Sequence, residues 1–368
     1  MGKNIQLQHG SVVLPTFLPD ATFGVVRYLD PQDLIRCQVD ALVMNTFHLM
    51  QKPGSTSIRS LGGIHKMTGW NRPIVTDSGG FQAFSLIHNN PKNGSLTDRG
   101  IIFRPEGNSD RILLTPEKTI QLQLSYGADI VICLDDCTHP DAPFEAQELS
   151  VKRTITWAKR CKMEFNRLIS EKKVRSNEKP SLFAVVQGGR SIELRRNCAE
   201  ALLDIGFDGY GYGGWPIDNQ GNLIVEMLSL VRQLIPKEYP LHALGVGHPR
   251  NIVLGSKLGW DLFDSSLPTR DARKGRLFAM KEDRFNPDYL NNSDWFDYVY
   301  IGDKKYIKEN KPVFNSCDCF CCQHFSLGYL HHLFKIEDGL FYRLATIHNL
   351  RFMTKLCEVI RSECHEDH

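Results

Sequence analysis

The chain has 368 residues, of which 42% are apolar and 23% are charged. This size and apolar content allow a large buried core, in one big domain or two ordinary ones, and exclude a chain too polar to fold. The net charge of +2 excludes no partner by itself, because nucleic-acid binding depends on whether basic residues gather locally, and here they gather after residue 268.

The first ten residues, MGKNIQLQHG, lack the apolar core of a signal peptide, and no apolar run approaches the ~18 residues that a membrane span needs. We therefore expect a cytoplasmic protein without membrane association. The 11 cysteines are an odd number, and seven of them lie outside the one dense cluster, which argues against a secreted disulfide framework. Reduced thiols are expected, so crowded cysteines indicate a metal.

Short apolar runs alternate with longer stretches of helical periodicity from the N-terminus onward. The apolar runs are residues 14–20, 41–47, 73–80, 129–136, 181–189, 209–214, 242–247 and 260–266. Amphipathic patterns lie between several of them, at 115–128, which opens with a Thr cap and a Pro at the first helical position, and at 145–165 and 191–206.

Eight buried strands, each followed by a helix or by room for one, predict an α/β fold of the (β/α)₈ TIM-barrel type. A doubly wound open sheet is the competing interpretation, but it usually has fewer strands and a glycine fingerprint that this chain lacks. We expect residues 1–280 to form the barrel core. Residues 281–340 are polar, aromatic and metal-like and predict an inserted subdomain, and residues 341–368 predict a terminal helix that closes the barrel. The charged segment 171–180 is expected to be a solvated connection.

Polar residues follow the predicted strands at the ends where barrel enzymes place their chemistry. They are Asp77, Ser78, Asp135, Asp136, Gln187, Gly213, Gly214 and Asp264. Where carboxylates converge, one tends to hold a proton while another stays anionic, which supplies an acid and a nucleophile. That pair suits displacement at the anomeric carbon of a sugar. Each Asp could instead cap the following helix, which we favour for Asp136 but not for Asp77 or Asp264.

Two further features lie near these strand ends. Gly213 and Gly214 suit a tight turn, and they also bring bare backbone donors close to a flat ligand. A basic cluster follows Asp264, formed by Arg270, Arg273, Lys274, Arg276 and Lys281. Such a cluster beside a catalytic carboxylate suits phosphates that flank a reacting sugar, although a solvated charged face explains the composition equally well.

The stretch CDCFCCQHF (317–325) packs four cysteines into six residues. From spacing alone, several side chains compete for a tetrahedral metal site: Cys317, Cys319, Cys321, Cys322, His324, His331, His332 and His348. A disulfide pair is the alternative, which the expected cytoplasmic location disfavours.

Eight motifs occur in one order along nearly the whole chain, from about residue 14 to 360. They are NTFHL (45–49), VTDSGGFQ (75–82), LTPE (114–117), LDDCT (134–138), VVQGG (185–189), GVG (245–247), LFDSSLPTR (262–270) and the C-x-C-x-x-C motif. Together they resemble the tRNA-guanine transglycosylases, also called queuine tRNA-ribosyltransferases, in their catalytic subunit. The resemblance implies exchange of guanine at the first anticodon position of tRNA for a free 7-deazaguanine base, either queuine or its aminomethyl precursor.

The resemblance also implies residue roles. Asp264 would attack the ribose, expel guanine and form a covalent ribosyl-enzyme, and Asp77 would be the general acid and base, so that two inversions give retention. The base would be held by Ser78, Asp135, Gln187 and the amide of Gly214, between Phe81 and Leu244, and would have to leave its stack. Arg270 and Arg273 would contact neighbouring phosphates.

The resemblance selects four metal ligands, Cys317, Cys319, Cys322 and His348, for a zinc ion. Four protein ligands leave no open position, so the implied Zn²⁺ is structural. Family members pair with themselves or with a related non-catalytic subunit, and we expect a homodimer.

The loop after the two glycines departs from the family pattern. It reads Trp215-Pro216-Ile217-Asp218-Asn219, and Pro216 cannot donate a backbone hydrogen bond. This loop would contact the substituent of the incoming base, so we expect the larger base queuine as substrate, although Cys137 is typical of bacterial members. Asp271-Ala272 also replaces the common Ser-Gly.

Two alternatives stay open. A relative that inserts a deazaguanine into DNA is compatible with the replaced loops, but the metal motif and the LPTR segment (267–270) favour tRNA. A non-catalytic partner subunit that only binds RNA should have lost its carboxylates, whereas Asp77, Asp135 and Asp264 all remain.

Overall fold

Eight parallel strands form the centre of the molecule. The computed structural model describes residues 3–104, 111–139, 142–282, 284–285, 287–291 and 294–366. The sheet runs in the order β3-β13-β12-β11-β10-β9-β5-β4, with every hydrogen-bonded pair parallel. Its strands are β3 Thr16–Pro19, β4 Leu42–Met44, β5 Ile74–Thr76, β9 Ile130–Ile132, β10 Ser181–Val186, β11 Gly209–Tyr212, β12 Leu241–Ala243 and β13 Leu262–Ser265.

The two ends of this sheet meet. A parallel bridge joins Asp20 to Val43, and the Ala21 amide donates to the Val43 carbonyl at 2.7 Å, so β3 contacts β4 at the last seam. The predicted TIM barrel is confirmed, and the open doubly wound sheet is excluded because its edge strands would not touch. Each of the eight strands lies within its predicted run, except that β12 begins one residue earlier than predicted.

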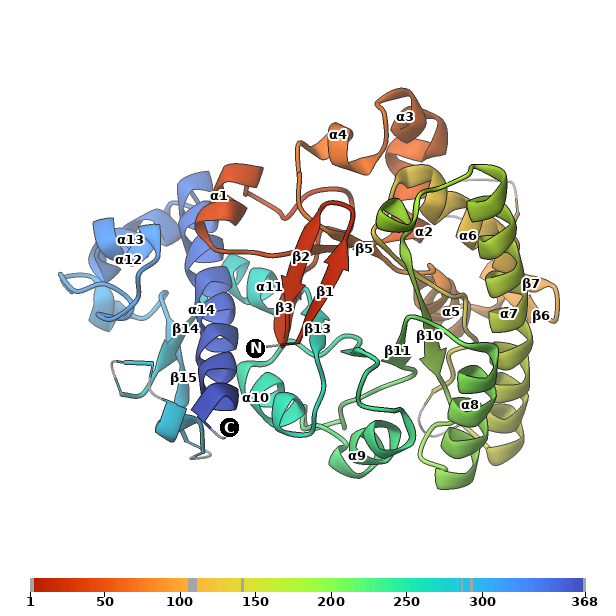
Figure 1. Ribbon diagram of the computed structural model, residues 1–368. Helices are drawn as coiled ribbons and strands as arrows, with labels where there is room; N and C mark the ends of the chain where they lie inside the picture. The colour runs from red at the N-terminus through yellow and green to blue at the C-terminus, as the bar shows by residue number, and fades with distance from the viewer. Residues whose placement is uncertain are drawn as a thin grey trace.

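Helices follow the strands and cover the barrel (Figure 1). They are α1 Pro31–Arg36, α2 Thr46–Leu49, α3 Ser55–Ser60, α4 Ile64–Thr68, α5 Gly80–Asn89, α6 Pro116–Tyr126, α7 Phe144–Glu171, α8 Ile192–Ile205, α9 Val225–Leu234, α10 Pro249–Lys257 and α11 Leu267–Arg273. The predicted helix at 115–128 is α6, where the Thr115 side chain accepts from the Lys118 amide and Pro116 stands in the first turn. Helix α8 begins similarly at Ser191, which accepts from the Leu194 amide.

Two apolar cores result from the alternation of side chains along each strand. One set of strand residues points outward to the helices, and the other fills the barrel with residues such as Leu18, Val75 and Phe183. An N-terminal hairpin, β1 Asn4–Leu7 and β2 Gly10–Val13, was not predicted and adds Val12 to the inner core (Figure 1). The hairpin closes the end of the barrel opposite to the catalytic end.

Two smaller sheets lie outside the barrel and were also not predicted. Strands β6 Gly94–Thr97, β7 Gly100–Phe103 and β8 Ile112–Leu114 form an antiparallel sheet between α5 and α6, and β14 Arg276–Met280 pairs with β15 Phe296–Tyr300.

The chain after β15 forms three helices, α12 Phe320–His324, α13 Leu327–Lys335 and α14 Gly339–Glu366. Figure 1 shows this part in blue at one side of the barrel, with α14 next to the first strands. Arg343 on α14 makes a two-pronged ion pair with Asp33 on α1, at 2.6 and 2.8 Å, which ties the end of the chain to its beginning. The predicted terminal helix is therefore present, whereas the division of the chain at residues 281 and 341 stays a prediction.

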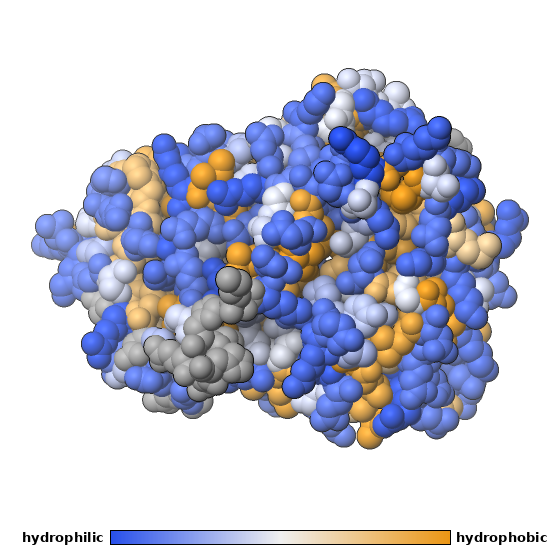
Figure 2. Space-filling model, viewed as in Figure 1, coloured by the Kyte–Doolittle hydropathy of each residue, from blue (hydrophilic) through white to orange (hydrophobic). Residues whose placement is uncertain are grey.

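The face shown in Figure 2 is mostly hydrophilic, with apolar side chains in small groups between the polar ones. Among the described residues, no helix combines the length and the apolar character needed to cross a membrane. Every cysteine that the structure describes has a free thiol.

Candidate active site and metal centre

A cavity of about 380 Å³ opens at the carboxyl ends of the barrel strands. Its position follows from the alternation of the strands, because the residue two positions beyond an inward-facing core residue also points inward. The core residues and the polar residues beyond them are Leu18 and Asp20 on β3, Val43 and Asn45 on β4, Val75 and Asp77 on β5, Val185 and Gln187 on β10, and Leu262 and Asp264 on β13. Asp20, Asn45, Asp77 and Asp264 therefore line one cavity, whereas Gln187 is buried and contacts the lining residue Asp135.

Asp77 is held by three donors on one wall of the cavity. Its Oδ1 accepts from the Thr46 and Gly79 amides at 3.0 and 3.1 Å, and Asn45 Nδ2 donates to its Oδ2 at 2.6 Å. Burial nevertheless raises the pKa of Asp77 to about 7, against the two amide bonds and with help from the negative charge of Asp264. Asp77 can therefore hold a proton near neutral pH.

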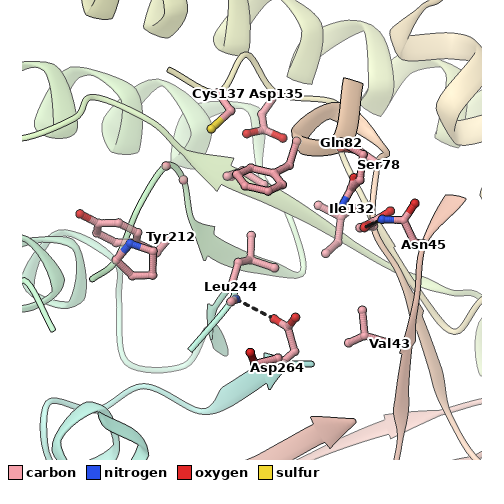
Figure 3. Close-up of a pocket in the computed structure, with 18 of the residues that line it drawn as sticks. Val43, Asn45, Ser78, Gln82, Ile132, Asp135, Cys137, Tyr212, Leu244 and Asp264 are labelled. Carbon is pink, nitrogen blue, oxygen red and sulfur yellow. Dashed lines mark hydrogen bonds between the residues drawn. The ribbon is translucent and has the colours of Figure 1, made fainter. Parts of the chain in front are cut away.

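Asp264 has a different environment on the neighbouring wall. His242 Nε2 and the Gly245 amide both donate to its Oδ1, at 2.8 and 3.1 Å, and the second of these bonds is drawn in Figure 3. His242 itself is fully buried on β12. Both of these contacts are made by Oδ1, so Oδ2 takes part in neither and is left for other chemistry.

Asp135 stands across the cavity from Asp264, beside Cys137 (Figure 3). Gln187 Nε2 donates to its Oδ2 at 2.6 Å, and burial raises the pKa of Asp135 to about 6 although this hydrogen bond opposes the shift. Within the described chain, Gln187 Oε1 is buried without a hydrogen-bond partner. This wall therefore offers acceptors for the N–H groups of a ligand.

Two glycines, Gly213 and Gly214, lie next to this wall and add no side chain to it. A Cβ on Gly213 would lie 2.6 Å from Gln187 Cδ and 2.8 Å from the Val186 carbonyl oxygen, so no larger residue fits. The Gly213 amide donates to that carbonyl at 2.9 Å and is not free for a ligand. Gly214, at φ +84°, lines the cavity, and its backbone conformation favours glycine.

Aromatic and apolar side chains cover the remaining walls. Phe81 is 41% exposed and meets Trp215 edge-on at 5.3 Å between ring centroids. Leu244 and Ser78 also line the cavity, and the Ser78 carbonyl is fixed by Thr119 Oγ1 at 2.7 Å. The Phe81 ring and the Leu244 side chain both border the space that a flat ligand would occupy.

Helix α11 begins just beyond Asp264 and carries the first two members of the predicted basic cluster. Arg270 is exposed, and Arg273 is half-buried with its pKa lowered by burial and by the nearby charge of Arg27. Two later members are held in ion pairs, Arg276 with Asp271 and Lys281 with Asp294. The predicted cluster is therefore divided, and Arg270 and Arg273 are the members nearest to the mouth.

Asp136 has a structural role, although not the predicted one. It does not cap α7, which begins after Pro143. Its Oδ2 instead accepts from Arg153 Nη1 at 2.5 Å, and Arg153 lies well inside α7 rather than at its first turn. The capping interpretation is wrong because the loop between β9 and α7 is too long for Asp136 to reach the helix terminus.

Sequence reasoning missed three residues of the site: Asp20, Asn45 and His242. Asp20 and Asn45 line the cavity, and His242 contacts Asp264. Counting two positions beyond each inward-facing strand residue would have found Asp20 and Asn45. His242 gave no such signal, because an isolated histidine inside an apolar strand resembles a core residue.

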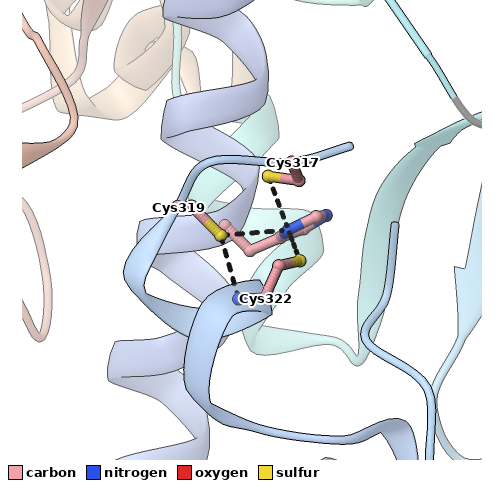
Figure 4. A group of neighbouring side chains, drawn as sticks. Cys317, Cys319 and Cys322 are labelled. Carbon is pink, nitrogen blue, oxygen red and sulfur yellow. Dashed lines mark hydrogen bonds between the residues drawn. The ribbon is translucent and has the colours of Figure 1, made fainter. Parts of the chain in front are cut away.

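Three cysteines converge beside α14, far from the cavity (Figure 4). The sulfur atoms of Cys317, Cys319 and Cys322 lie 3.8, 3.5 and 3.2 Å from His348 Nδ1. Zn–S and Zn–N bonds of about 2.3 and 2.1 Å at a tetrahedral angle would separate S and N by roughly 3.6 Å. The four side chains thus have the spacing of a metal site.

The partner on the far side of the His348 ring supports this interpretation. His348 Nε2 donates to the Phe278 carbonyl on β14 at 2.7 Å, which directs Nδ1 toward the sulfur atoms, as second partners of metal-bound histidines do. The other candidates from spacing are not members of the group: Cys321 is buried beside Cys319 without joining the four, His324 and His332 are exposed, and His331 is near the Ile301 carbonyl.

A second group with metal-ligand side chains lies at the opposite end of the barrel. His9 and His65 stack at 3.6 Å and contact the two oxygens of Asp129 at 2.8 and 3.1 Å. Burial would raise the pKa of Asp129, but hydrogen bonds from His65, the Ile74 amide and His9 outweigh it and lower that pKa. These contacts fasten the N-terminal hairpin to the barrel, so the group has a sufficient structural explanation.

A closed parallel barrel with unlike carboxylates in one cavity at its carboxyl ends defines a TIM-barrel enzyme. The sequence model of a family described as "Queuine tRNA-ribosyltransferase" matches residues 3–368. Proteins with that name are 36% identical over 363 residues in Psychrobacter sp. (strain PRwf-1), covering 99% of this chain and 89% of the relative, and 38% identical over 357 residues in Mannheimia succiniciproducens, covering 97% and 87%. A third, from Thermoanaerobacter pseudethanolicus, is 35% identical over 363 residues, covering 99% and 89%. The chain belongs to the queuine tRNA-ribosyltransferase family.

Proposed function

We propose that this protein exchanges guanine at the first anticodon position of tRNA for a free 7-deazaguanine base, by two displacements at the ribose. The observation that carries the proposal is the inequality of Asp77 and Asp264 in one cavity. Burial raises the pKa of Asp77 to about 7, which suits a general acid and base, whereas Asp264 receives two donors on Oδ1, which leaves Oδ2 as the oxygen for the attack.

In the first step, Asp264 Oδ2 forms a bond to C1′ while the bond from C1′ to guanine N9 breaks. Guanine takes a proton from Asp77, so it leaves as the neutral base. In the second step, Asp77 takes the N9 proton of the incoming base, whose nitrogen attacks C1′ and releases Asp264. Each step inverts C1′, so the β-configuration is retained.

The base stands against the wall formed by Asp135 and Gln187. Asp135, fixed by Gln187, accepts from the ring N–H and the exocyclic amine, and the Gly214 amide donates to the carbonyl oxygen. Ser78 completes the polar contacts, and Phe81 and Leu244 cover the two faces of the ring. Gly213 contributes space rather than a hydrogen bond, because its amide is already used.

The incoming base is queuine rather than its aminomethyl precursor. Trp215 and Pro216 line the cavity where the substituent of the base would lie. Pro216 has no N–H, and the Trp215 indole offers an apolar surface to a larger substituent. Exchange of labelled guanine in tRNA against each unlabelled base tests this, and a clear preference for the aminomethyl base would overturn it.

The remaining parts hold the RNA. Arg270 and Arg273 contact phosphates next to the target nucleotide. A zinc ion on Cys317, Cys319, Cys322 and His348 is structural, because four protein ligands leave no site for a substrate. The protein acts as a cytoplasmic homodimer.

Covalent trapping of the RNA tests the whole proposal. Wild-type protein mixed with tRNA should give an adduct that survives denaturing electrophoresis, and Asp264→Asn should give none while keeping its fold. Asp204→Asn, which changes an exposed carboxylate on α8, is the matched control. Exchange into genomic DNA but not into tRNA would favour the DNA-modifying alternative, and undiminished turnover by Asp264→Asn would remove Asp264 from its role.

A further inference from the structure

Asp20 is a third carboxylate at the mouth, between the two reacting ones. Around the barrel, the neighbouring strands β13, β3, β4 and β5 carry Asp264, Asp20, Asn45 and Asp77 at their inward-facing carboxyl ends. Leu18 pairs with Asp264 in the strand register, so Asp20 stands one inward position further toward the mouth. Any group that Asp264 attacks must therefore lie close to Asp20.

The surroundings of Asp20 leave it with unused acceptor capacity. Within the described chain, Thr22 Oγ1 donates to its Oδ1, the Thr22 amide also donates to the carboxylate, and the charge of Arg273 acts on it without a hydrogen bond between the two side chains. The residue is half-buried, and burial raises its pKa, with a further contribution from the charge of Asp264. A carboxylate oxygen that has lost water in a cavity is costly unless a ligand supplies a donor.

The position of the base decides which donor is available. The base-binding wall lies on β9, β10 and β11, across the cavity from these four strands, so the sugar must lie above β13, β3, β4 and β5. Of the two sugar atoms bonded to C1′, the ring oxygen has no proton, whereas C2′ carries a hydroxyl group in RNA. A carboxylate beside the attacking oxygen repels the former and accepts a hydrogen bond from the latter.

We infer that Asp20 accepts a hydrogen bond from the 2′-hydroxyl of the target nucleotide and so selects ribose over deoxyribose in the reaction. This inference rests on the proposed base exchange. Two alternative roles for Asp20 are to hold the backbone turn at Thr22 and to stabilise positive charge at C1′. Both of those roles act equally on ribose and deoxyribose, so the ratio of the two substrates separates them from recognition of the hydroxyl.

The test uses two anticodon stem–loop RNAs that differ only by guanosine or 2′-deoxyguanosine at the exchanged position. For each, kcat/KM for release of labelled guanine is measured with the wild-type protein, Asp20→Asn, Asp20→Ala and the control Asp204→Asn. The wild-type and control proteins should prefer the ribonucleotide by about 10- to 100-fold, which is typical of a hydrogen bond to a charged group.

Asp20→Ala should lower kcat/KM for the ribonucleotide by most of that factor and change the deoxynucleotide little, so that the ratio approaches one. Asp20→Asn keeps the shape and a neutral acceptor, and should give an intermediate ratio even if the alanine variant folds poorly. Two results would overturn the inference about Asp20 but not the proposed function. One is an active wild-type protein with equal kcat/KM for the two substrates, and the other is an Asp20 variant whose kcat/KM falls by the same factor for both. A wild-type protein that exchanges neither substrate nor intact tRNA would overturn the proposed function itself.

Discussion

Replacing Asp77 by asparagine should stabilise the protein at alkaline pH while abolishing exchange. The Asp77 carboxyl has an ordinary pKa of 3.8 and a folded-state pKa of about 7, mainly because of burial. Between these values the folded protein binds a proton that the unfolded chain has released. The free energy of unfolding of the wild-type protein therefore falls as pH rises through this window, and it stays low above pH 7.

The magnitude follows from the width of the window. The full difference between the two pKa values corresponds to about 4 kcal/mol, and the part between pH 5.5 and pH 7 to about 2 kcal/mol. The amide introduced at this position would lose the hydrogen bond from Asn45, at a cost of about 1–3 kcal/mol. That cost is present at both pH values, so it cancels when the two are compared.

The assay is urea unfolding of the wild-type protein, Asp77→Asn and the control Asp204→Asn at pH 5.5 and pH 8. The free energy of unfolding of Asp77→Asn, relative to wild type, should increase by about 2 kcal/mol from the lower to the higher pH. Asp204→Asn should show no such increase. If the free energies of unfolding of Asp77→Asn and wild type differed by the same amount at both pH values, Asp77 would not be protonated in the folded protein. Its assignment as the acid would then fail as well.

Three further outcomes are expected. His242→Ala removes one of two donors to Asp264 and should lower kcat by about 10- to 100-fold at pH 7 without changing tRNA affinity. The measurement is guanine exchange, and an unchanged kcat would contradict a role for His242. Gly213→Ala should raise KM for the free base more than it changes KM for tRNA, because the new Cβ displaces Gln187, and equal effects would argue against the base wall. Cys319→Ser, or chelation of the metal, should lower the melting temperature and tRNA affinity while kcat at saturating tRNA stays close to wild type, and loss of kcat alone would contradict a structural metal.

Much of the fold was predictable because each strand carries its own signal. The barrel strands are short apolar runs, buried on both faces, and such a run is recognisable without the rest of the chain. The polar residues at their ends, such as Asp77 and Asp264, were found for the same reason. The hairpin β1–β2 and the strand β6 were missed because these strands are partly exposed and mix polar with apolar residues, so they do not form apolar runs.

The site was predicted in part, and its missing members share a cause. Asp20 and Asn45 lie in the predicted runs 14–20 and 41–47 but were not named as site residues, and His242 was hidden within a strand. Their importance comes from neighbours far along the chain: His242 acts on Asp264, and Asn45 on Asp77. The capping role of Asp136 failed likewise, because its partner Arg153 is reached only through the folded path of α7.

The sequence by itself determined the kinds of elements, their order, and the chemical groups that reach the mouth of the barrel, because periodicity and motifs are written over a few adjacent residues. Only the tertiary structure decided that β3 meets β4, that Asn45 and His242 contact the two carboxylates, and that Asp77 and Asp264 have unequal surroundings. Burial and electrostatic coupling depend on atoms that lie close in space but far apart along the chain. That is why the carboxylates could be named from the sequence, whereas the burial that raises the pKa of Asp77 could not.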